Sequence, residues 1–243
     1  MELLAGSIMI TTLDSLDQDG FAIIPEVLDE ITVDRLREAI EHADVGEAVR
    51  QRRGAVFAIR NLLDVVAEIR EVVSSAAVRN LIEPVLGGDA FVVRAILFDK
   101  TPDANWKVAW HQDMSIAVTE RIDVSGFGPW SVKAGIIHVR PPVAVLQGMV
   151  TLRIHLDDCN EFNGALQVVP GSHRRGFLDA EELQACRGSS DIRLCCVPAG
   201  GAMLMRPLIA HASSPGTSPS RRRVIHLEWA ATPLPQPLQW HRA

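Results

Sequence analysis

The 243-residue chain contains no tyrosine and only four cysteines, and both scarcities narrow the possible chemistry. The absence of tyrosine removes one common acid–base side chain. The cysteines, at positions 159, 186, 195 and 196, lack a C-x-x-C spacing, and the adjacent Cys195 and Cys196 cannot form an ordinary unstrained disulfide. We therefore expect reduced thiols and a cytoplasmic protein.

Long apolar runs and basic stripes are also missing. No apolar run approaches the ~20 residues of a membrane span, and the N-terminus lacks the pattern of a secretory signal. The 24 basic and 30 acidic residues are mixed and give a net charge of -6, so nothing draws the chain to nucleic acid or to an anionic membrane. We expect a small-molecule substrate, no nucleic-acid or membrane partner, and a monomer or homodimer.

The apolar content, 47% of the residues, is enough for one sizeable core. We predict a single domain over residues 1–243, with helical support over about 1–89 and a β-rich core over about 90–232. In the first part, Thr32 is a suitable helix cap, and a second apolar-periodic stretch, Leu62–Leu86, stops at two glycines. These helices are expected to support the core from outside.

From about Ala90 the apolar period changes to two, which predicts short strands separated by turns. Strands at this spacing indicate a mainly β fold, an antiparallel sandwich or barrel with flanking helices. The predicted strands are Phe91–Phe98, Trp106–Val118, Met149–Asp157, Leu166–Val169, Gly201–Leu208 and Arg222–Ala230.

Two of these strands carry an unusually polar face. Such alternation is explained either by a half-solvated sheet or by a small barrel with a functional interior, whose apolar face packs under the N-terminal helices. The polar positions are Thr151, Arg153, His155 and Asp157 in one strand, and Arg222, His226 and Glu228 in the other.

His111 and Asp113 form an H-x-D pair inside a period-two region, so both side chains should emerge on one side. An imidazole and a carboxylate placed in this way can bind adjacent positions of one metal ion, although the spacing alone is common by chance. His211, which comes at the end of a distant β-rich run, can supply a third ligand. A 2-His-1-carboxylate face of this kind binds Fe(II) and leaves positions open.

Arg222 begins the last predicted strand, and its guanidinium could reach the far carboxylate of a dicarboxylate bound at the metal. Ser213 could donate a hydrogen bond to the same carboxylate. For the neighbouring Arg221 we expect a solvated turn. Arg153, on the polar face, is a further candidate for this pocket, and a structural ion pair with an acidic neighbour is its alternative.

The sequence resembles the phytanoyl-CoA dioxygenase family of Fe(II)/2-oxoglutarate oxygenases. The resemblance is carried by Asp19-Gly20-Phe21, by Trp110-His111-Gln112-Asp113, by the segment from Asn163-Gly164 to Pro170-Gly171-Ser172-His173, and by His211 with Ser213 and Arg222 after it. These pieces span most of the chain.

The resemblance implies a double-stranded β-helix, which is a cupin-like jelly roll, with His111, Asp113 and His211 as iron ligands. It implies a salt bridge from Arg222 to 2-oxoglutarate, supported by Ser213, and leaves the role of Arg153 open. The implied reaction uses Fe(II), 2-oxoglutarate and O2 to hydroxylate an unactivated C–H bond, with release of succinate and CO2.

Several residues near this predicted site remain open. His226 shares a face with Arg222 and could line the pocket, but a hydrogen-bonded core histidine is the simpler interpretation. The loop from Ser125 to Lys133 is expected to cover the mouth of the site. The substrate should be selected by segments such as 58–63 and 124–142, in which Arg60, Lys133 and Arg140 could anchor an anionic group or serve as ordinary structural cations.

Two other functions remain possible at this point. One is a cupin-like metal-dependent barrel enzyme that does not use 2-oxoglutarate, against which Arg222 and Ser213 argue. The other is a non-catalytic β-sandwich binding protein with structural histidines. An assay for succinate separates the first from the predicted oxygenase, and titration with iron separates the second.

Overall fold

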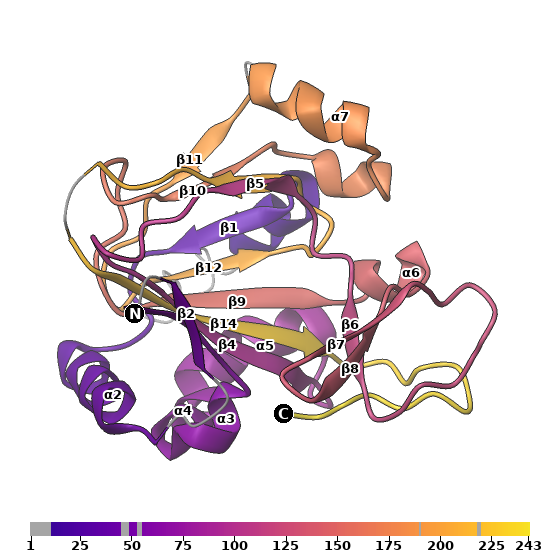
Figure 1. Ribbon diagram of the computed structural model, residues 1–243, viewed down its shortest axis with the longest axis horizontal. Helices are drawn as coiled ribbons and strands as arrows, with labels where there is room; N and C mark the ends of the chain where they lie inside the picture. The colour runs from indigo at the N-terminus through magenta and orange to yellow at the C-terminus, as the bar shows by residue number, and fades with distance from the viewer. Residues whose placement is uncertain (1–10, 45–48, 53–54, 190, 218–219) are drawn as a thin grey trace.

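The computed structural model describes residues 11–44, 49–52, 55–189, 191–217 and 220–243. Its strands form a seven-stranded sheet, a four-stranded sheet and a three-stranded sheet. In Figure 1 the seven-stranded sheet crosses the middle of the molecule, with helices α2 to α5 on one side and the four-stranded sheet on the other. The helices are α2 (Glu30–His42), α3 (Leu62–Val65), α4 (Ala67–Ser74), α5 (Ala76–Leu86), α6 (Val143–Gln147) and α7 (Ala180–Ala185).

The major sheet has the order β1-β12-β9-β14-β4-β3-β2, and all of its pairs are antiparallel. The central strand β14 is paired along its length with β4 on one side and with β9 on the other. The strands are β1 (Phe21–Ile24), β2 (Val49–Arg52), β3 (Ala55–Arg60), β4 (Phe91–Lys100), β9 (Val150–His155), β12 (Ala202–Met205) and β14 (Arg222–Ala230).

The minor sheet faces the major sheet and has the order β11-β10-β13-β5. Its strands are β5 (Val108–His111), β10 (Leu166–Val168), β11 (Arg193–Cys195) and β13 (His211–Ser213). A third sheet, at the right of Figure 1, contains β6 (Ile116–Val118), β7 (Trp130–Lys133) and β8 (Ile136–Val139) in the order β6-β8-β7. Two facing antiparallel sheets give the sandwich that the period-two pattern predicted.

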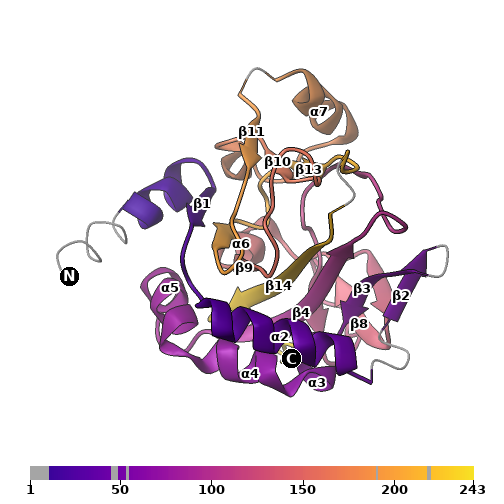
Figure 2. The ribbon, with the colours of Figure 1, turned by 90° about the vertical axis from the view of Figure 1, so that its left-hand side faces the viewer.

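The alternation along β14 separates the helix-covered core from the space between the two sheets. Ile225, Leu227 and Trp229 belong to the largest core cluster together with apolar residues of α2, α4 and α5. Figure 2 shows these helices lying side by side under β4 and β14. The intervening residues Arg222 and His226 are also buried, but they belong to the polar interior. Of the two interpretations of the polar face, the half-solvated sheet is therefore wrong, and the polar side chains of β14 lie in the interior.

The structure differs from the expected helical support over residues 1–89. Strands β1 and β3 lie in this region and extend the major sheet by pairing with β12 and β4. Helix α2 begins earlier than expected, because the side chain of Asp29 accepts a hydrogen bond from the Thr32 backbone N–H and caps the helix. Thr32 is thus the donor in the cap rather than the capping residue. The stretch 62–86 forms three short helices and ends at Gly87 as predicted.

The run 106–118 is not one strand. Strand β5 ends at His111 and β6 starts at Ile116, and the two strands belong to different sheets. The segment 125–133, expected to be a loop, contains β7 at its end. Apart from β3, which has six residues, the strands missed in the described ranges have three or four residues each, so a period-two pattern has little length in which to be recognised.

Candidate functional site

His111 and His211 lie side by side at one end of the minor sheet, because the ladder between β5 and β13 pairs them directly. Their ring centroids are 4.1 Å apart. Asp113 follows the end of β5, and its Oδ2 lies 3.8 Å from His211 Nε2. The potential ligand atoms of the three residues all lie within 4.8 Å of one another. The three residues that the sequence nominated as metal ligands are therefore brought together.

The hydrogen bonds of the two histidines fix their tautomers. The Nδ1 atoms of His111 and His211 lie 2.9 Å from the carbonyl oxygens of Ala109 and Ile209, respectively. A carbonyl can only accept, so each Nδ1 carries the proton and each Nε2 presents a lone pair. Burial, and then the nearby His111, lowers the pKa of His211 to about 3, so its ring is neutral at physiological pH. A neutral imidazole whose Nδ1 holds the proton has an Nε2 lone pair with which to bind a metal ion.

Gln112, the residue between the two ligands of the H-x-D pair, holds this segment in position. Its side-chain amide donates to the carbonyl oxygens of Gly176 (2.8 Å) and Leu208 (2.6 Å), and accepts from the Leu178 N–H at 2.8 Å. The Asp113 backbone N–H donates to the Pro207 carbonyl at 3.0 Å. Strand β5 ends at His111, and beyond it these hydrogen bonds hold the backbone in place of strand pairing. The Asp113 side chain itself keeps a buried Oδ2 with no hydrogen-bond partner, as expected of an atom that awaits a cation.

A chain of polar groups on the major sheet runs beside these ligands. Arg94 is ion-paired with Glu228, whose Oε1 lies 3.2 Å from His226 Nε2, and His226 Nδ1 lies 2.9 Å from Arg153 NH1. An arginine can only donate, so His226 Nδ1 accepts and the proton resides on Nε2, which donates to Glu228. His226 is therefore the hydrogen-bonded core histidine of the two interpretations. Asp113, His226 and Glu228 also offer ligand atoms within 4.8 Å of one another. Both nitrogens of His226 are already engaged, which favours the other group of three for a metal ion.

Arg222 lies in the polar interior, directly opposite Lys100 in the ladder between β14 and β4. Its NH1 donates to the Gly164 carbonyl and contacts Cys159 Sγ at 3.7 Å, and its buried Nε has no hydrogen-bond partner. Lys100 Nζ donates to Ser213 Oγ at 2.8 Å and to the Ser214 carbonyl at 2.6 Å. The Ser213 hydroxyl donates in turn to the Gly164 carbonyl at 2.8 Å, so Arg222 and Ser213, the pair predicted from the sequence, meet at this carbonyl.

Lys100 is a site residue that the sequence interpretation missed. Only 3% of its surface is exposed. Burial, and then the nearby Arg222, lowers its pKa to about 7. The sequence did contain a pattern that could have identified Lys100. The alternation of β4 continues beyond the predicted end at Phe98 and puts Lys100 on the same face of the strand as Arg94. A buried ammonium beside a buried guanidinium is costly unless an anion compensates for it.

Arg153 and His155 complete this electropositive interior. Burial, followed by the charge of Arg222, lowers the pKa of Arg153 to about 10. Burial and the same two arginines hold the pKa of His155 well below its ordinary value. In the part of the chain that the structure describes, Arg153 forms no ion pair with a carboxylate, so the expected structural ion pair is wrong. The partner of Arg153 is His226.

Two neighbouring arginines point away from this interior. Arg221, expected in a solvated turn, is exposed just before β14 and also forms ion pairs with Asp99 (2.7 Å) and Glu41 (2.8 Å). Arg223 pairs with Asp157 at 2.8 Å. Of the three consecutive arginines, the middle one faces the interior, as the alternation of β14 requires.

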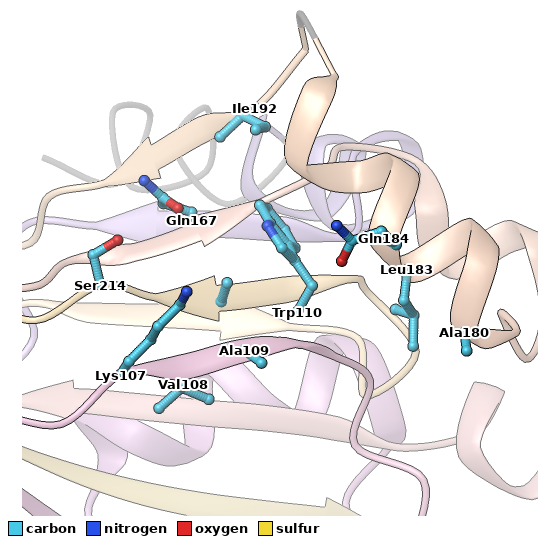
Figure 3. Close-up of a pocket in the computed structure, with 11 residues that line it drawn as sticks. Lys107, Val108, Ala109, Trp110, Gln167, Ala180, Leu183, Gln184, Ile192 and Ser214 are labelled. Atoms are coloured by element: carbon cyan, nitrogen blue, oxygen red, sulfur yellow. The ribbon is translucent and has the colours of Figure 1, made fainter.

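Two cavities adjoin the minor sheet, on its opposite faces. One, of about 470 Å³, lies on the inner side against His111 and Asp113, and Arg60, Pro129 and Lys133 are among its lining residues. The segments expected to select the substrate therefore contribute to this cavity. The other, also of about 470 Å³, lies between the sheet and α7. Figure 3 shows Trp110 of β5 in this outer cavity, beside Gln184 of α7.

A family model described as phytanoyl-CoA dioxygenase matches residues 16–224. An L-proline trans-4-hydroxylase from Streptomyces griseoviridis is 26% identical over 238 residues, which cover 86% of this chain and 81% of that protein. An ectoine dioxygenase from Nocardia farcinica is 27% identical over 180 residues, or 70% of this chain and 52% of that protein.

Among solved structures, EctD from S. alaskensis with 2-oxoglutarate and 5-hydroxyectoine has a TM-score of 0.68 at 17% identity. The match covers 90% of this chain and 74% of that one. At this identity the likeness concerns the fold, and it confirms the predicted cupin-like jelly roll. No helix in the described ranges is long and apolar enough to cross a bilayer.

Proposed function

The chain belongs to the phytanoyl-CoA dioxygenase family of Fe(II)/2-oxoglutarate oxygenases, and from that premise we propose the reaction it performs and the residues that perform it. The proposed reaction is hydroxylation of an unactivated C–H bond in a small organic metabolite. Substrate, 2-oxoglutarate and O2 are converted to hydroxylated substrate, succinate and CO2. The relatives named proline hydroxylase and ectoine dioxygenase support a small-molecule substrate.

The observation that carries the proposal is the convergence of two Nε2 lone pairs and one unpartnered carboxylate oxygen at His111, His211 and Asp113. Two imidazoles and one carboxylate are the donor set that suits non-haem Fe(II) and leaves coordination positions open. When bound, the iron and 2-oxoglutarate supply the oxidising chemistry. The chain orients its ligands by the backbone carbonyls behind the two rings and by the amide of Gln112.

The cosubstrate fits the buried cations of the interior. Arg222 and Lys100 face one another with no carboxylate partner among the described residues, and the distal carboxylate of 2-oxoglutarate would neutralise them. Ser213, whose hydroxyl accepts from Lys100 and donates to the Gly164 carbonyl, would orient Lys100 toward that carboxylate, and it would donate to the carboxylate itself only by releasing Gly164. Arg153, another buried cation of the same interior, would add to the positive potential while holding His226. This cation pocket favours the oxygenase over a barrel enzyme that has no dicarboxylate to bind.

The proposal is tested by uncoupled turnover. Purified protein would be incubated with Fe(II), ascorbate and 2-oxoglutarate, and succinate would be measured while small metabolites are screened for stimulation. We expect slow succinate release that a substrate accelerates and that His211→Ala abolishes. The surface variant His42→Ala is the matched control and should retain full release. Metal binding without any consumption of 2-oxoglutarate would favour the alternative barrel enzyme.

A further inference from the structure

The cavity above the metal ligands carries more positive than negative charge. Four basic side chains line it, and Asp113 is the only carboxylate among its described lining residues. The chain as a whole has a net charge of -6, so this cavity is positively charged in a protein that is negatively charged overall. The basic residues are Arg60, Arg94, Lys133 and Arg140.

Two of the charges in this cavity are already balanced. Arg94 is paired with Glu228, and Asp113 belongs to the proposed iron site. The charges of Fe(II), Asp113 and a 2-oxoglutarate dianion sum to one negative charge, so the loaded centre offsets little of the remaining excess. Lys133 and Arg140 have no carboxylate partner within the described ranges. The guanidinium of Arg140 lies over the Phe177 ring, 3.8 Å from its centroid, which holds it in place.

Lys133 is the best-placed anchor for an anion. It is half-buried, and its Nζ has a single hydrogen-bond partner, the hydroxyl of Ser115 at 3.2 Å. An ammonium offers three donors, so two remain available. Burial, and then the charges of Arg94 and Arg60, lowers the pKa of Lys133. An anion beside this ammonium would compensate for its desolvation and for the repulsion by Arg94 and Arg60. Because the Ser115 hydroxyl accepts from Lys133, its own proton is also available.

The rest of the cavity wall is suited to an apolar body. Ile96, Phe98 and Trp130 line the same space as the basic residues and the metal ligands. A small molecule with an anionic end at Lys133 would therefore lay its carbon skeleton along these side chains and beside His111 and Asp113. The ammonium and the hydroxyl together match the two oxygens of a carboxylate.

We propose that the substrate of this oxygenase is a small organic acid whose carboxylate binds Lys133 and the Ser115 hydroxyl. The inference rests on the proposed function and adds the chemical class of the substrate. It also gives a role to Lys133, which has no carboxylate partner within the described ranges.

The test uses a pair of probes that differ only in charge, pivalate and the neutral pivalamide. Protein loaded with Mn(II) and saturated with 2-oxoglutarate would be titrated with each probe, and paramagnetic relaxation of the tert-butyl protons would report binding near the metal. We expect at least ~10-fold tighter binding of pivalate, which corresponds to about 1.4 kcal/mol. Saturating 2-oxoglutarate keeps the probe away from Arg222 and Lys100.

Matched variants assign the preference to its residues. Lys133→Met should reduce the preference for pivalate to less than ~3-fold, and Ser115→Ala should weaken pivalate binding by ~3–10-fold. Lys107→Met, on the exposed outer side of the minor sheet, should leave the preference unchanged. Thermal unfolding would verify that each variant is folded, and calorimetric titration would verify that each still binds 2-oxoglutarate.

Each remaining outcome overturns a defined part of the argument. Equal binding of the two probes, or a preference that survives Lys133→Met, would overturn the organic-acid assignment while leaving the oxygenase intact if 2-oxoglutarate still binds. Tighter binding of tert-butylphosphonate than of pivalate would replace the carboxylate by a phosphate-type group. Failure of the metal-loaded protein to bind 2-oxoglutarate would overturn the proposed function and the organic-acid assignment together.

Discussion

Replacing Lys100 by methionine should make the cosubstrate-free protein more stable and the cosubstrate binding weaker. Methionine has a similar volume but carries no charge to be desolvated. The substitution removes the hydrogen bonds from Nζ to Ser213 and to the Ser214 carbonyl, which offsets part of the gain. The pH dependence of the stability difference is therefore more informative than its absolute size.

The direction of that dependence follows from the pKa of Lys100, which falls from 10.5 to about 7 in the folded protein. Between these two pH values the unfolded chain binds more protons than the folded one, so this lysine makes stability rise with pH. For a shift of this size, the wild type would lose about 2.6 kcal/mol between pH 9 and pH 6. Relaxation and the effective dielectric of a real interior reduce the expected loss to ~1–2 kcal/mol.

The measurement is denaturant unfolding of the wild type, Lys100→Met and Lys107→Met at pH 6 and pH 9, without 2-oxoglutarate. The advantage of Lys100→Met over the wild type should be ~1–2 kcal/mol larger at pH 6. The control substitution of the exposed Lys107 should show no such dependence. Calorimetry should find 2-oxoglutarate bound ~10–100-fold more weakly by Lys100→Met, as for loss of a buried charge partner. A stability difference that is the same at both pH values would refute the argument that Lys100 is a desolvated ammonium.

Three further predictions concern the metal, the cosubstrate and the product. Alanine in place of His111, Asp113 or His211 should remove most Fe(II) affinity without unfolding the protein, and full iron binding by any two of these variants would reject the ligand set. Arg222→Ala should weaken 2-oxoglutarate binding by ~2–5 kcal/mol and spare iron binding, whereas Arg223→Ala, on the opposite face of β14, should leave the cosubstrate affinity unchanged. Equal effects of the two substitutions would contradict the assigned orientation of Arg222. Because Asp113 would occupy a coordination position in the proposed iron site and add negative charge there, turnover in excess chloride should yield a product heavier by one oxygen atom, and mass spectrometry that finds a halogenated product would refute this.

Residues in long alternating strands were the easiest to predict. Strand β14 has the bounds that its sequence pattern predicted, and Arg222 and His226 lie on the polar face that the alternation assigned to them. His111 and Asp113 were predicted from a strand spacing of two residues, but β5 ends at His111, and the hydrogen bonds of Gln112 hold Asp113 beside it instead of a shared strand face. The features of β14 depend on the sequence within one strand, which is the information that a single sequence contains.

Features that depend on the register between distant strands were not predictable from the pattern of one strand, and the meeting of His211 with His111 was predicted through the family resemblance. The ion pair of Arg94 with Glu228 joins residues 134 positions apart, and only the ladder between β4 and β14 makes them neighbours. The role of Lys100 depends on the same ladder, which sets it opposite Arg222. The predicted start of helix α2 was wrong for a local reason. Asp29 and Thr32 are both suitable N-cap residues, and the sequence does not say which side chain accepts the capping hydrogen bond.

The side chain of Gln112 connects separate parts of the chain by hydrogen bonds. One amide ties the backbone at Gly176, Leu178 and Leu208 to the peptide that joins His111 to Asp113. Leu178 is followed directly by Asp179, the N-cap of α7, and residues of α7 line the outer cavity. The hydrogen bond from Leu178 to Gln112 therefore connects α7 to the segment between His111 and Asp113. A displacement of the backbone at 176–178 would therefore reach the peptide between His111 and Asp113, and it would shift the Asp113 carboxylate relative to the two histidines from the opposite face of the minor sheet.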